Sequence, residues 1–546
     1  RSERIQPELI FKPENCCDQS DYLPVKEYAD KREKAVIGSS RTEIESEAIR
    51  NFCTANVGEE ISVLRKMALP DFIAGQQITP EIIKNPASIL PMFTDFSDYI
   101  YSENFPGINR IMTGMRANNQ VDIQWELYKV GETGEHKAIR TLSSQSLRDV
   151  LKGTGKSCDL DAIYKLKAAY LRKQINIKVN QDSFAVFMNK FRSRNSFSRV
   201  TFECLAEEFE REFNFDLVEA TRELYDQHGL AALRVQDIEQ YTGKGNEGPM
   251  LAFSVWNSSD VNGIISAYTD KGDGSRDLLN VGDFMIRAGE CSRICFPLPH
   301  SVGGVILQTN LAQNIPGNYI YNFMEFPQEA LVHAGRKKLE PSCFLPSSGE
   351  IVVDSEDQGF HVFASETKES LLGKLLQDKM IVEDSGVDFL TDNAPGWVSS
   401  VYIDAYGFPV RSFLGKKTKN SQARAEWKTE IPEQGEYGVS IYKLDLDFRY
   451  QRQADSVAYY YTLEQGDYRA DIVMSFLRNG LQNIYLSDNL GRKEEYSYQQ
   501  QMPQCGWIQV GVLPLVKGKV KLILHDKGAF PEQLVFVDAV KWVKKS

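Results

Sequence analysis

The spacing of hydrophobic residues changes along the chain from a helical period to a strand period. In the first part, Phe202, Leu205, Phe209 and Phe213 form one stripe among Glu and Arg residues, which predicts a helix over 201–228. Gly229 follows this stripe, as is common just after a helix end. The helical spacing predicts a mainly helical domain over residues 1–240.

Two other stripes of this domain also predict helices. One consists of Ile163, Leu166, Ala169 and Tyr170, and the other of Ile44, Ala48 and Phe52 behind Thr42, a good helix N-cap residue. The segment 121–128 (VDIQWELY) alternates instead, as a strand does. We therefore expect a division into two subdomains near 120–155.

A glycine-rich break at 241–248 (YTGKGNEG) precedes a different pattern. From Met250 to about Met324, short apolar runs such as LAFSVWN and GIISAYT are separated by turn residues about every 8 to 15 positions. This pattern predicts a small antiparallel β-sandwich over 241–345.

The final part of the chain, 351–546, is rich in Val and Tyr and alternates with polar residues. Runs such as GEYGVSIYKL, SVAYYYTL and RADIVMSFL predict a β-sandwich or jelly roll, interrupted by a short helical insertion at 368–379. The predicted fold class is therefore multidomain α+β, with a helical N-terminal region followed by two antiparallel β-sandwich domains.

Composition and charge restrict the functional classes. The chain has 546 residues, with 42% hydrophobic and 25% charged, as expected for a folded protein of about three or four domains. Its net charge of −12 lacks the basic footprint that nucleic-acid binding requires. The chain starts at Arg1 without an initiator Met or an apolar leader. We therefore expect a processed chain or a part of a longer one.

Strong catalytic motifs are absent from the sequence. None of the six histidines forms an H-E-x-x-H pair, no G-x-S-x-G occurs, and the nine cysteines are scattered without a C-x-x-C pair. Gly153-Thr-Gly-Lys156-Ser157 resembles the end of a phosphate-binding loop, but Val150 stands where that loop needs Gly. We expect a helix end there, and buried, unreactive thiols at most cysteines.

Two acidic turns are candidate calcium sites, because Ca²⁺ prefers oxygen ligands. The first contains Asp270, Asp273 and Asp277, and the second contains Asp354, Glu356 and Asp357. Both lack the regular ligand spacing of an EF-hand, so solvated turns are the simpler interpretation. A structural Ca²⁺ at Asp354, Glu356 and Asp357 is the better of the two hypotheses, and no other cofactor is expected.

Aromatic residues of the last domain are candidate ligand platforms. Tyr459, Tyr460 and Tyr461 lie in one predicted strand, so Tyr460 must face away from its two neighbours. Sugar rings stack on exposed aromatic faces, yet sandwich cores use the same residues. We expect most of these aromatics in the core, and the candidates for ligand binding are Trp397, Tyr460 and Trp507.

The order of short motifs in 351–546 resembles that of a golvesin-like C-terminal domain. The motifs are Val353-Asp354, Trp397, Ala425-Glu-Trp427, Gly435-Glu-Tyr437-Gly-Val439, Tyr459 to Tyr461, Gly506-Trp507 and Asp538-Ala-Val540. The turn after the tyrosine strand departs from the family pattern. The resemblance implies a sandwich similar to carbohydrate-binding modules of secreted bacterial enzymes, and it carries over no catalytic residue.

A second resemblance covers 200–360. Phe253 to Asn257, Thr309 to Leu311, Asn314 to Pro316 and Val353 to Phe360 resemble the tail of bacterial proteins that join an ABC-transporter permease to an M1-aminopeptidase-like region. The peptidase's zinc motif is missing. This resemblance implies a non-catalytic portion outside the cytoplasm, with a membrane or transporter component as a partner.

Our leading hypothesis is a non-catalytic, extracytoplasmic bacterial protein that binds a glycan, a peptide or a partner protein. One alternative is a secreted peptidase or glycosidase that uses carboxylate pairs whose separation the sequence does not show. Another is a structural subunit of an assembly, which would present a large buried interface and no cleft.

Overall fold

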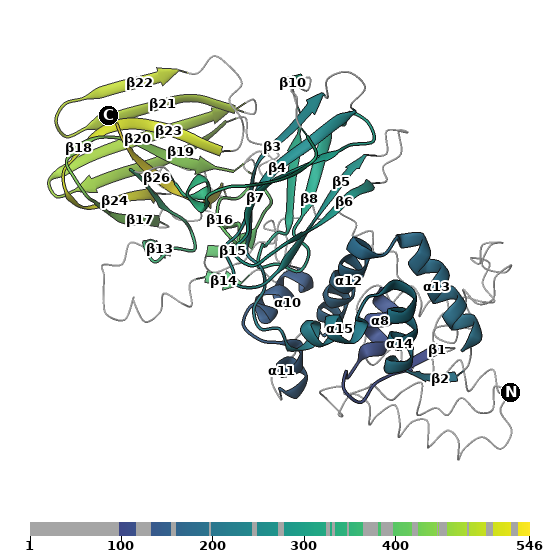
Figure 1. Ribbon diagram of the computed structural model, residues 1–546. Helices are drawn as coiled ribbons and strands as arrows, with labels where there is room; N and C mark the ends of the chain where they lie inside the picture. Colours follow the sequence, from purple (N-terminus) through teal and green to yellow (C-terminus); the bar gives the residue numbers. More distant parts are fainter. Residues whose placement is uncertain are drawn as a thin grey trace, which may run out of the picture. The chain divides into compact units, whose positions relative to one another are not determined.

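A computed structural model describes most of the chain from Asp98 onward (Figure 1). The described residues are 98–115, 133–153, 160–195, 198–242, 248–270, 278–323, 328–329, 333–346, 349–363, 381–383, 397–417, 424–444, 446, 456–477, 480–497, 506–525 and 533–545. The predicted helix near Thr42, the strand at 121–128, the insertion at 368–379, Asp273 and Asp277 lie outside them. The chain forms two compact units, one within 1–119 and 141–229 and the other comprising 120–140 and 230–546.

The first unit is helical. Its elements are β1 (Asp98–Tyr101), α8 (Ile108–Gly114), α11 (Leu147–Lys152), α12 (Leu160–Lys178), α13 (Gln181–Arg194), β2 (Ser198–Thr201), α14 (Phe202–Phe213) and α15 (Leu217–Asp226), while α10 (Gly134–Leu142) spans the division between the units. The strands β1 and β2 pair in parallel. The structure confirms the helix predicted around Ile163 and the helix end at Gly153. None of the described helices is long and apolar enough to cross a lipid bilayer.

The predicted helix over 201–228 is two helices. Asn214 has a left-handed backbone (φ 50°) and ends α14, and the Asp216 side chain then accepts the Glu219 N–H and caps α15. The predicted stripe is nevertheless correct for its first three members, since Phe202, Leu205 and Phe209 are fully buried. Hydrophobic residues continue at helical spacing beyond Asn214, so the sequence pattern did not show that the helix ends there.

A small sandwich begins the second unit. Its strands are β3 (Leu233–Thr242), β4 (Pro249–Asn257), β5 (Gly263–Asp270), β6 (Leu278–Ile286), β7 (Cys291–Pro297), β8 (Gly304–Gln308), β9 (Asn318–Asn322), β10 (Gln328–Glu329) and β11 (Gly335–Lys338). They form the sheets β10-β3-β4-β7-β11 and β6-β5-β8-β9 around one hydrophobic core. Almost all of β3 lies before residue 241, where the sequence predicted the domain to start. A bulge between Gln236 and Glu239 interrupts the alternation of β3 and explains the difference.

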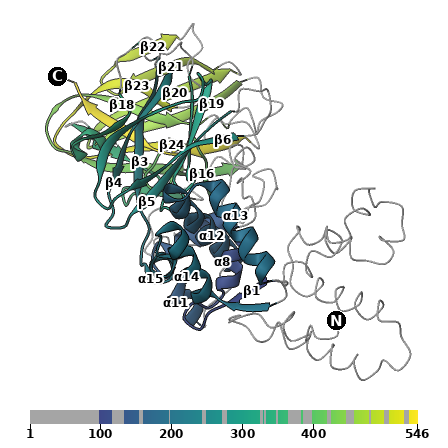
Figure 2. The same cartoon turned by 45° about the vertical axis from the view of Figure 1, so that its right-hand side comes forward.

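The second sandwich contains three sheets. Its strands are β12 (Glu350–Val353), β13 (Phe360–Phe363), β14 (Ile381–Glu383), β15 (Trp397–Val401), β16 (Ser412–Lys417), β17 (Arg424–Ile431), β18 (Gly435–Lys443), β19 (Ser456–Gln465), β20 (Tyr468–Leu477), β21 (Gly480–Asp488), β22 (Lys493–Ser497), β23 (Gly506–Leu515), β24 (Gly518–His525), β25 (Leu534–Val537) and β26 (Val540–Lys544). The sheets are β13-β17-β24-β19-β20-β21-β22, β12-β26-β18-β23 and β14-β15-β16-β25. Figure 2 shows β19 to β22 side by side in the seven-stranded sheet. The predicted fold class is confirmed.

Alternation along β19 separates core from surface. Tyr459 and Tyr461 are buried in the core with Trp427 and Trp542, whereas Tyr460 between them is partly exposed. On the neighbouring strands β20 and β24, the residues paired with Tyr459 and Tyr461 also face the core, and those paired with Tyr460 also face outward. The seven-stranded sheet therefore has one face in the core and one outer face.

The two sandwiches contact each other through the segment 402–411, which connects β15 with β16. Arg411 is partly buried and donates to three carbonyl oxygens: Ile403 (2.6 Å) in its own segment, and Pro316 (2.7 Å) and Asn318 (2.6 Å) in the first sandwich. Its guanidinium also lies over the Tyr319 ring, 4.6 Å from the centroid. These contacts fasten the second sandwich to the first.

Candidate functional site

One row of side chains crosses the outer face of the seven-stranded sheet. The strand register brings seven residues into line: Phe363, Arg424, His525, Tyr460, Val473, Tyr485 and Glu495. All seven are at least partly exposed. With strands about 4.8 Å apart, the row extends about 29 Å. It is long enough to accept an extended polymer.

The row places flat rings beside polar groups. Tyr485 is 40% exposed, and Tyr460 lies two strands away, at about 10 Å, on the same face. At one end of the row, the Arg424 guanidinium stacks over the Phe363 ring at 4.3 Å. Beside the row, Thr462 is 4% exposed and its hydroxyl donates to Asp471 (2.8 Å), so the accessible polar groups are Arg424, His525 and Glu495 of the row itself. Such a face offers both stacking surfaces and hydrogen-bonding groups.

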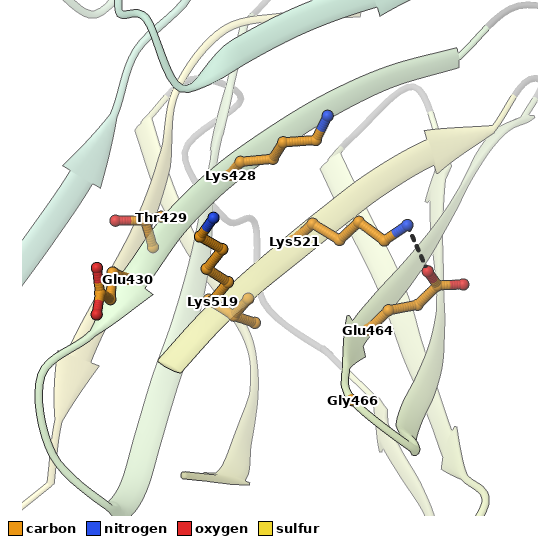
Figure 3. A pocket seen from close by; sticks show the side chains of 8 residues that line it. Lys428, Thr429, Glu430, Glu464, Gly466, Lys519 and Lys521 are labelled. Atoms are coloured by element: carbon orange, nitrogen blue, oxygen red, sulfur yellow. Dashed lines mark ion pairs between the residues drawn. The ribbon is translucent and has the colours of Figure 1, made fainter. Parts of the chain in front are cut away.

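A shallow hollow of about 600 Å³ lies further along the same sheet, about 13 Å from the row. It is lined by Lys428, Thr429, Glu430, Glu464, Gly466, Lys519, Val520 and Lys521 (Figure 3). Lys521 pairs with Glu464 at 2.7 Å, and Lys428 pairs with Glu426 at 2.8 Å. The lining thus carries charges of both signs, which suits a polar ligand better than an apolar one.

The structure does not bring the three predicted aromatic ligand residues together. Trp397 is 1% exposed in the core, where its indole N–H donates to the Phe363 carbonyl (3.2 Å), so it presents no face to a ligand. Trp507 is partly exposed on β23, in the sheet β12-β26-β18-β23, and packs against Tyr406 and Tyr442. Only Tyr460 belongs to the row. Tyr485, which the sequence analysis did not single out, joins it through register.

The predicted calcium turn is a network of internal hydrogen bonds. Asp357 Oδ2 accepts the Asp354 N–H (2.8 Å), and Glu356 Oε1 accepts the Ser412 hydroxyl (2.6 Å). Asp354 Oδ1 accepts the Ser355 N–H (2.6 Å). These bonds occupy oxygens that a metal ion would need.

Asp538 is the member of this network that the sequence analysis did not propose. It lies between β25 and β26 in the Asp538-Ala-Val540 motif, is 2% exposed, and its Oδ2 accepts the Tyr406 N–H (2.8 Å). Burial, and then the charge of Asp354, raises the pKa of Asp538 well above its usual range. Burial likewise raises the pKa of Asp354 to about 7. Both effects favour protonated carboxyl groups.

This carboxyl pair does not fit either chemistry that acidic pairs commonly serve. Glycosidase carboxylates stand about 5 to 9.5 Å apart around a sugar, whereas Asp354 is 8% exposed and Asp538 2% exposed, so neither presents its carboxyl group to a ligand. Over the described ranges, no three His, Cys, Asp or Glu side chains gather in a way that could hold a metal ion. Calcium at Asp354, Glu356 and Asp357 stays a prediction.

The cysteines that the structure describes are free thiols. Cys291 and Cys295 are buried, and burial raises the pKa of both, which makes them poor nucleophiles. Cys204 and Cys343 are exposed. The expectation of buried thiols holds for Cys291 and Cys295 and does not hold for Cys204 and Cys343.

Comparisons with known proteins leave the fold unassigned to a family. No family model matches the sequence, and no curated protein matches it. Among solved structures, a Paenibacillus xanthan lyase aligns at 11% identity over 57% of this chain and 26% of its own, with a TM-score of 0.22. An isomalto-dextranase of Arthrobacter globiformis T6 aligns at 11% identity over 63% of this chain and 45% of its own (TM-score 0.18). A β-glucuronidase of Bacteroides uniformis aligns at 10% identity over 58% and 30% (TM-score 0.16).

The chain thus spans less than half the length of each of these three proteins. TM-scores this low do not establish a shared fold. The chemistry of the site therefore rests on the residues of this chain.

Proposed function

We propose that the second sandwich binds a glycan chain along the row on the outer face of its seven-stranded sheet. The observation that carries this proposal is the alignment of Tyr460 and Tyr485 with Arg424, His525 and Glu495 across seven strands. The C–H faces of sugar rings pack on aromatic rings, while hydroxyl groups pair with charged and amide side chains. A spacing of about 10 Å between the two tyrosines matches roughly two sugar rings along a chain.

A peptide ligand is a less suitable occupant of this face. Extended peptides commonly add to a free sheet edge and place side chains in apolar pockets. The edge strand β22 carries Lys493, Glu494 and Glu495, and such charges oppose strand addition. The row itself is shallow and mixed in polarity, which favours sugar hydroxyls over apolar anchors.

The proposal includes a non-catalytic role outside the cytoplasm. It is supported by the order of motifs from Val353-Asp354 to Asp538-Ala-Val540, which is similar to that of golvesin-like domains. A transporter-associated location would follow from the second resemblance, over 200–360.

The test is binding of the full chain to a panel of soluble polysaccharides, measured by affinity gel electrophoresis and then by calorimetry. Tyr485→Ala and Tyr460→Ala should each weaken binding by about ten-fold or more, as expected for the loss of an aromatic anchor. Tyr496→Ala is the matched control. Tyr496 is 38% exposed on the neighbouring strand, but it pairs with Ile484 and so follows the opposite parity.

Two outcomes would refute this proposal. The first is that the wild-type chain binds none of the polymers. The second is that Tyr496→Ala weakens binding as much as Tyr485→Ala, because then the row would have no special role.

A further inference from the structure

Three lysines gather around the hollow on the seven-stranded sheet. Lys428 comes from β17, and Lys519 and Lys521 come from β24 (Figure 3). The strand register pairs Lys428 directly with Lys521, so both side chains lie on one face of the sheet. Lys519 precedes Lys521 by two residues and therefore faces the same way. The three ammonium groups share the outer face with the row.

The pairing of Lys428 with Lys521 does not help the sheet to form. Like charges directly opposite each other on neighbouring strands destabilise a sheet. The chain as a whole also has more acidic than basic residues, 75 against 63, so a gathering of lysines runs against its composition. A bound anion would relieve the repulsion between the two lysines.

Neighbouring carboxylates neutralise only part of this charge. Lys521 pairs with Glu464 at 2.7 Å. Lys428 pairs with Glu426 at 2.8 Å, but the other oxygen of Glu426 lies 3.2 Å from Arg424 Nε. The Glu426 side chain is 3% exposed. One buried carboxylate thus serves two cations and has no capacity for a third.

Lys519 is the cation that remains. Its register partner is Glu430, yet within the described ranges no carboxylate lies at ion-pair distance from the Lys519 ammonium group (Figure 3). The lining of the hollow contains three lysines and two glutamates. About one positive charge is therefore left without a partner, and Lys519 carries most of it.

The hollow is accessible to a ligand. The Lys428 and Lys521 side chains are each 38% exposed, and Lys519 is exposed. A Cβ atom on Gly466, at the rim, would have no other atom within 4 Å, so the rim is open. The volume of about 600 Å³ lies within the usual range for small-ligand sites.

We propose that this hollow binds one acidic group of the glycan, a carboxylate or a sulfate ester, so that the ligand of the second sandwich is an acidic polysaccharide. The inference rests on the proposed function, since the row supplies the remaining contacts. The hollow lies about 13 Å from the row, roughly the length of two to three sugar rings. A branch or a bend of one glycan chain spans that distance.

The charge of the hollow favours a singly charged group. One unpartnered ammonium matches a carboxylate or a sulfate ester, whereas a phosphate monoester brings nearly two negative charges close to Glu430 and Glu464. A nucleic acid is less suitable still. Its binding needs several phosphate contacts from Lys and Arg, and a single surplus positive charge does not provide them.

The experiment measures binding of the full chain to two pairs of soluble polymers by calorimetry. The pairs are polygalacturonate with its methyl ester, and dextran sulfate with dextran, so the members of a pair share a backbone and differ in charge. The net charge of −12 alone would disfavour the acidic member. We expect the wild type to bind the acidic member of at least one pair about five-fold more tightly, as for one exposed ion pair.

The two pairs also separate the two kinds of acid. A preference in the first pair identifies a carboxylate, and a preference in the second identifies a sulfate ester. Either preference should shrink as salt is added, because ions screen exposed charges.

Lys519→Gln locates the effect at the hollow. This variant should lose most of the preference for the acidic polymer and bind the neutral member as the wild type does, and Lys519→Glu should reverse the preference. Both should fold, because Lys519 is exposed, and thermal melting checks this. The matched control is Lys337→Gln, an equal change in net charge at an exposed position of β11, which should keep the preference. Tyr485→Ala should weaken both members of a pair by the same factor.

The outcomes distinguish this inference from the proposed function. Equal affinity for the members of both pairs would overturn the acidic subsite and leave the glycan-binding row intact. A loss of preference in Lys337→Gln as large as in Lys519→Gln would also overturn it, since net charge would then be the cause. So would a single-stranded oligonucleotide that binds as tightly as the acidic polysaccharides. A chain that binds no polysaccharide would refute the row and the subsite together.

Discussion

Replacing Arg411 by Met tests the joint between the two sandwiches. The change removes the donors to Pro316 (2.7 Å) and Asn318 (2.6 Å) across the joint and leaves these carbonyls without their partner. Hydrogen bonds from a charged donor contribute about 1.5–3 kcal/mol each, so the two together give about 3–6 kcal/mol. Part of the cost of burying a guanidinium is recovered, so we expect the lower half of that range.

Scanning calorimetry of the full chain measures this effect. For a unit of this size we expect the midpoint of the β transition of Arg411→Met to fall by about 5 °C. It should also broaden or split, because the sandwiches would unfold less cooperatively once unfastened. The control is Arg336→Met, which removes an exposed ion pair with Glu290 (2.9 Å) and should cost about 1 kcal/mol or less. If the two variants lost free energies of unfolding that differed by less than about 1 kcal/mol, Arg411 would not fasten the joint.

Two further predictions concern buried polar groups. Trp427→Phe removes the indole N–H that donates to the Asp538 carbonyl (2.8 Å) and leaves a small cavity. Urea denaturation should therefore show a free energy of unfolding that is lower by about 2–4 kcal/mol. A decrease below about 1 kcal/mol would contradict the importance of this bond. In the helical unit, burial lowers the pKa of Lys167 to about 8 while its Nζ donates to the Leu224 carbonyl (2.9 Å). The folded state then holds fewer protons than the unfolded state between about pH 8 and 10.5, so wild-type stability should rise with pH in this range. Lys167→Met should abolish that rise in urea titrations and change stability at pH 7 by less than about 2 kcal/mol, whereas an unchanged rise would show that another group causes it.

The architecture could be predicted from the sequence because the spacing of hydrophobic residues follows the local backbone geometry of helices and strands. The stripe Phe202, Leu205 and Phe209 and the alternation Tyr459, Tyr460, Tyr461 both appear in the structure as predicted. Interruptions of period were harder to locate. Asn214 ended a helix inside a continuous stripe, and the bulge in β3 hid a strand among polar residues.

The site was only partly predictable because it depends on pairing between distant strands. Tyr460 was recognised from its own strand, but Tyr485 joins it through two registers that the sequence does not specify. Asp354 was recognised as one of several acids in a turn. Asp538 lies 184 positions further along the chain (538 − 354), and only folding brings it close enough for the charge of Asp354 to raise its pKa.

The position of β26 has a consequence for how the second sandwich forms during synthesis. β26 lies inside its sheet, between β12 and β18, and Trp542 on it is fully buried in the core. The strand made first in this domain, β12, therefore has no partner until nearly two hundred further residues have been added. Until then β12 and β18 both expose unpaired backbone groups, and a nascent chain in that state needs protection from other strands. Folding of this sandwich is thus tied to completion of Val540–Lys544.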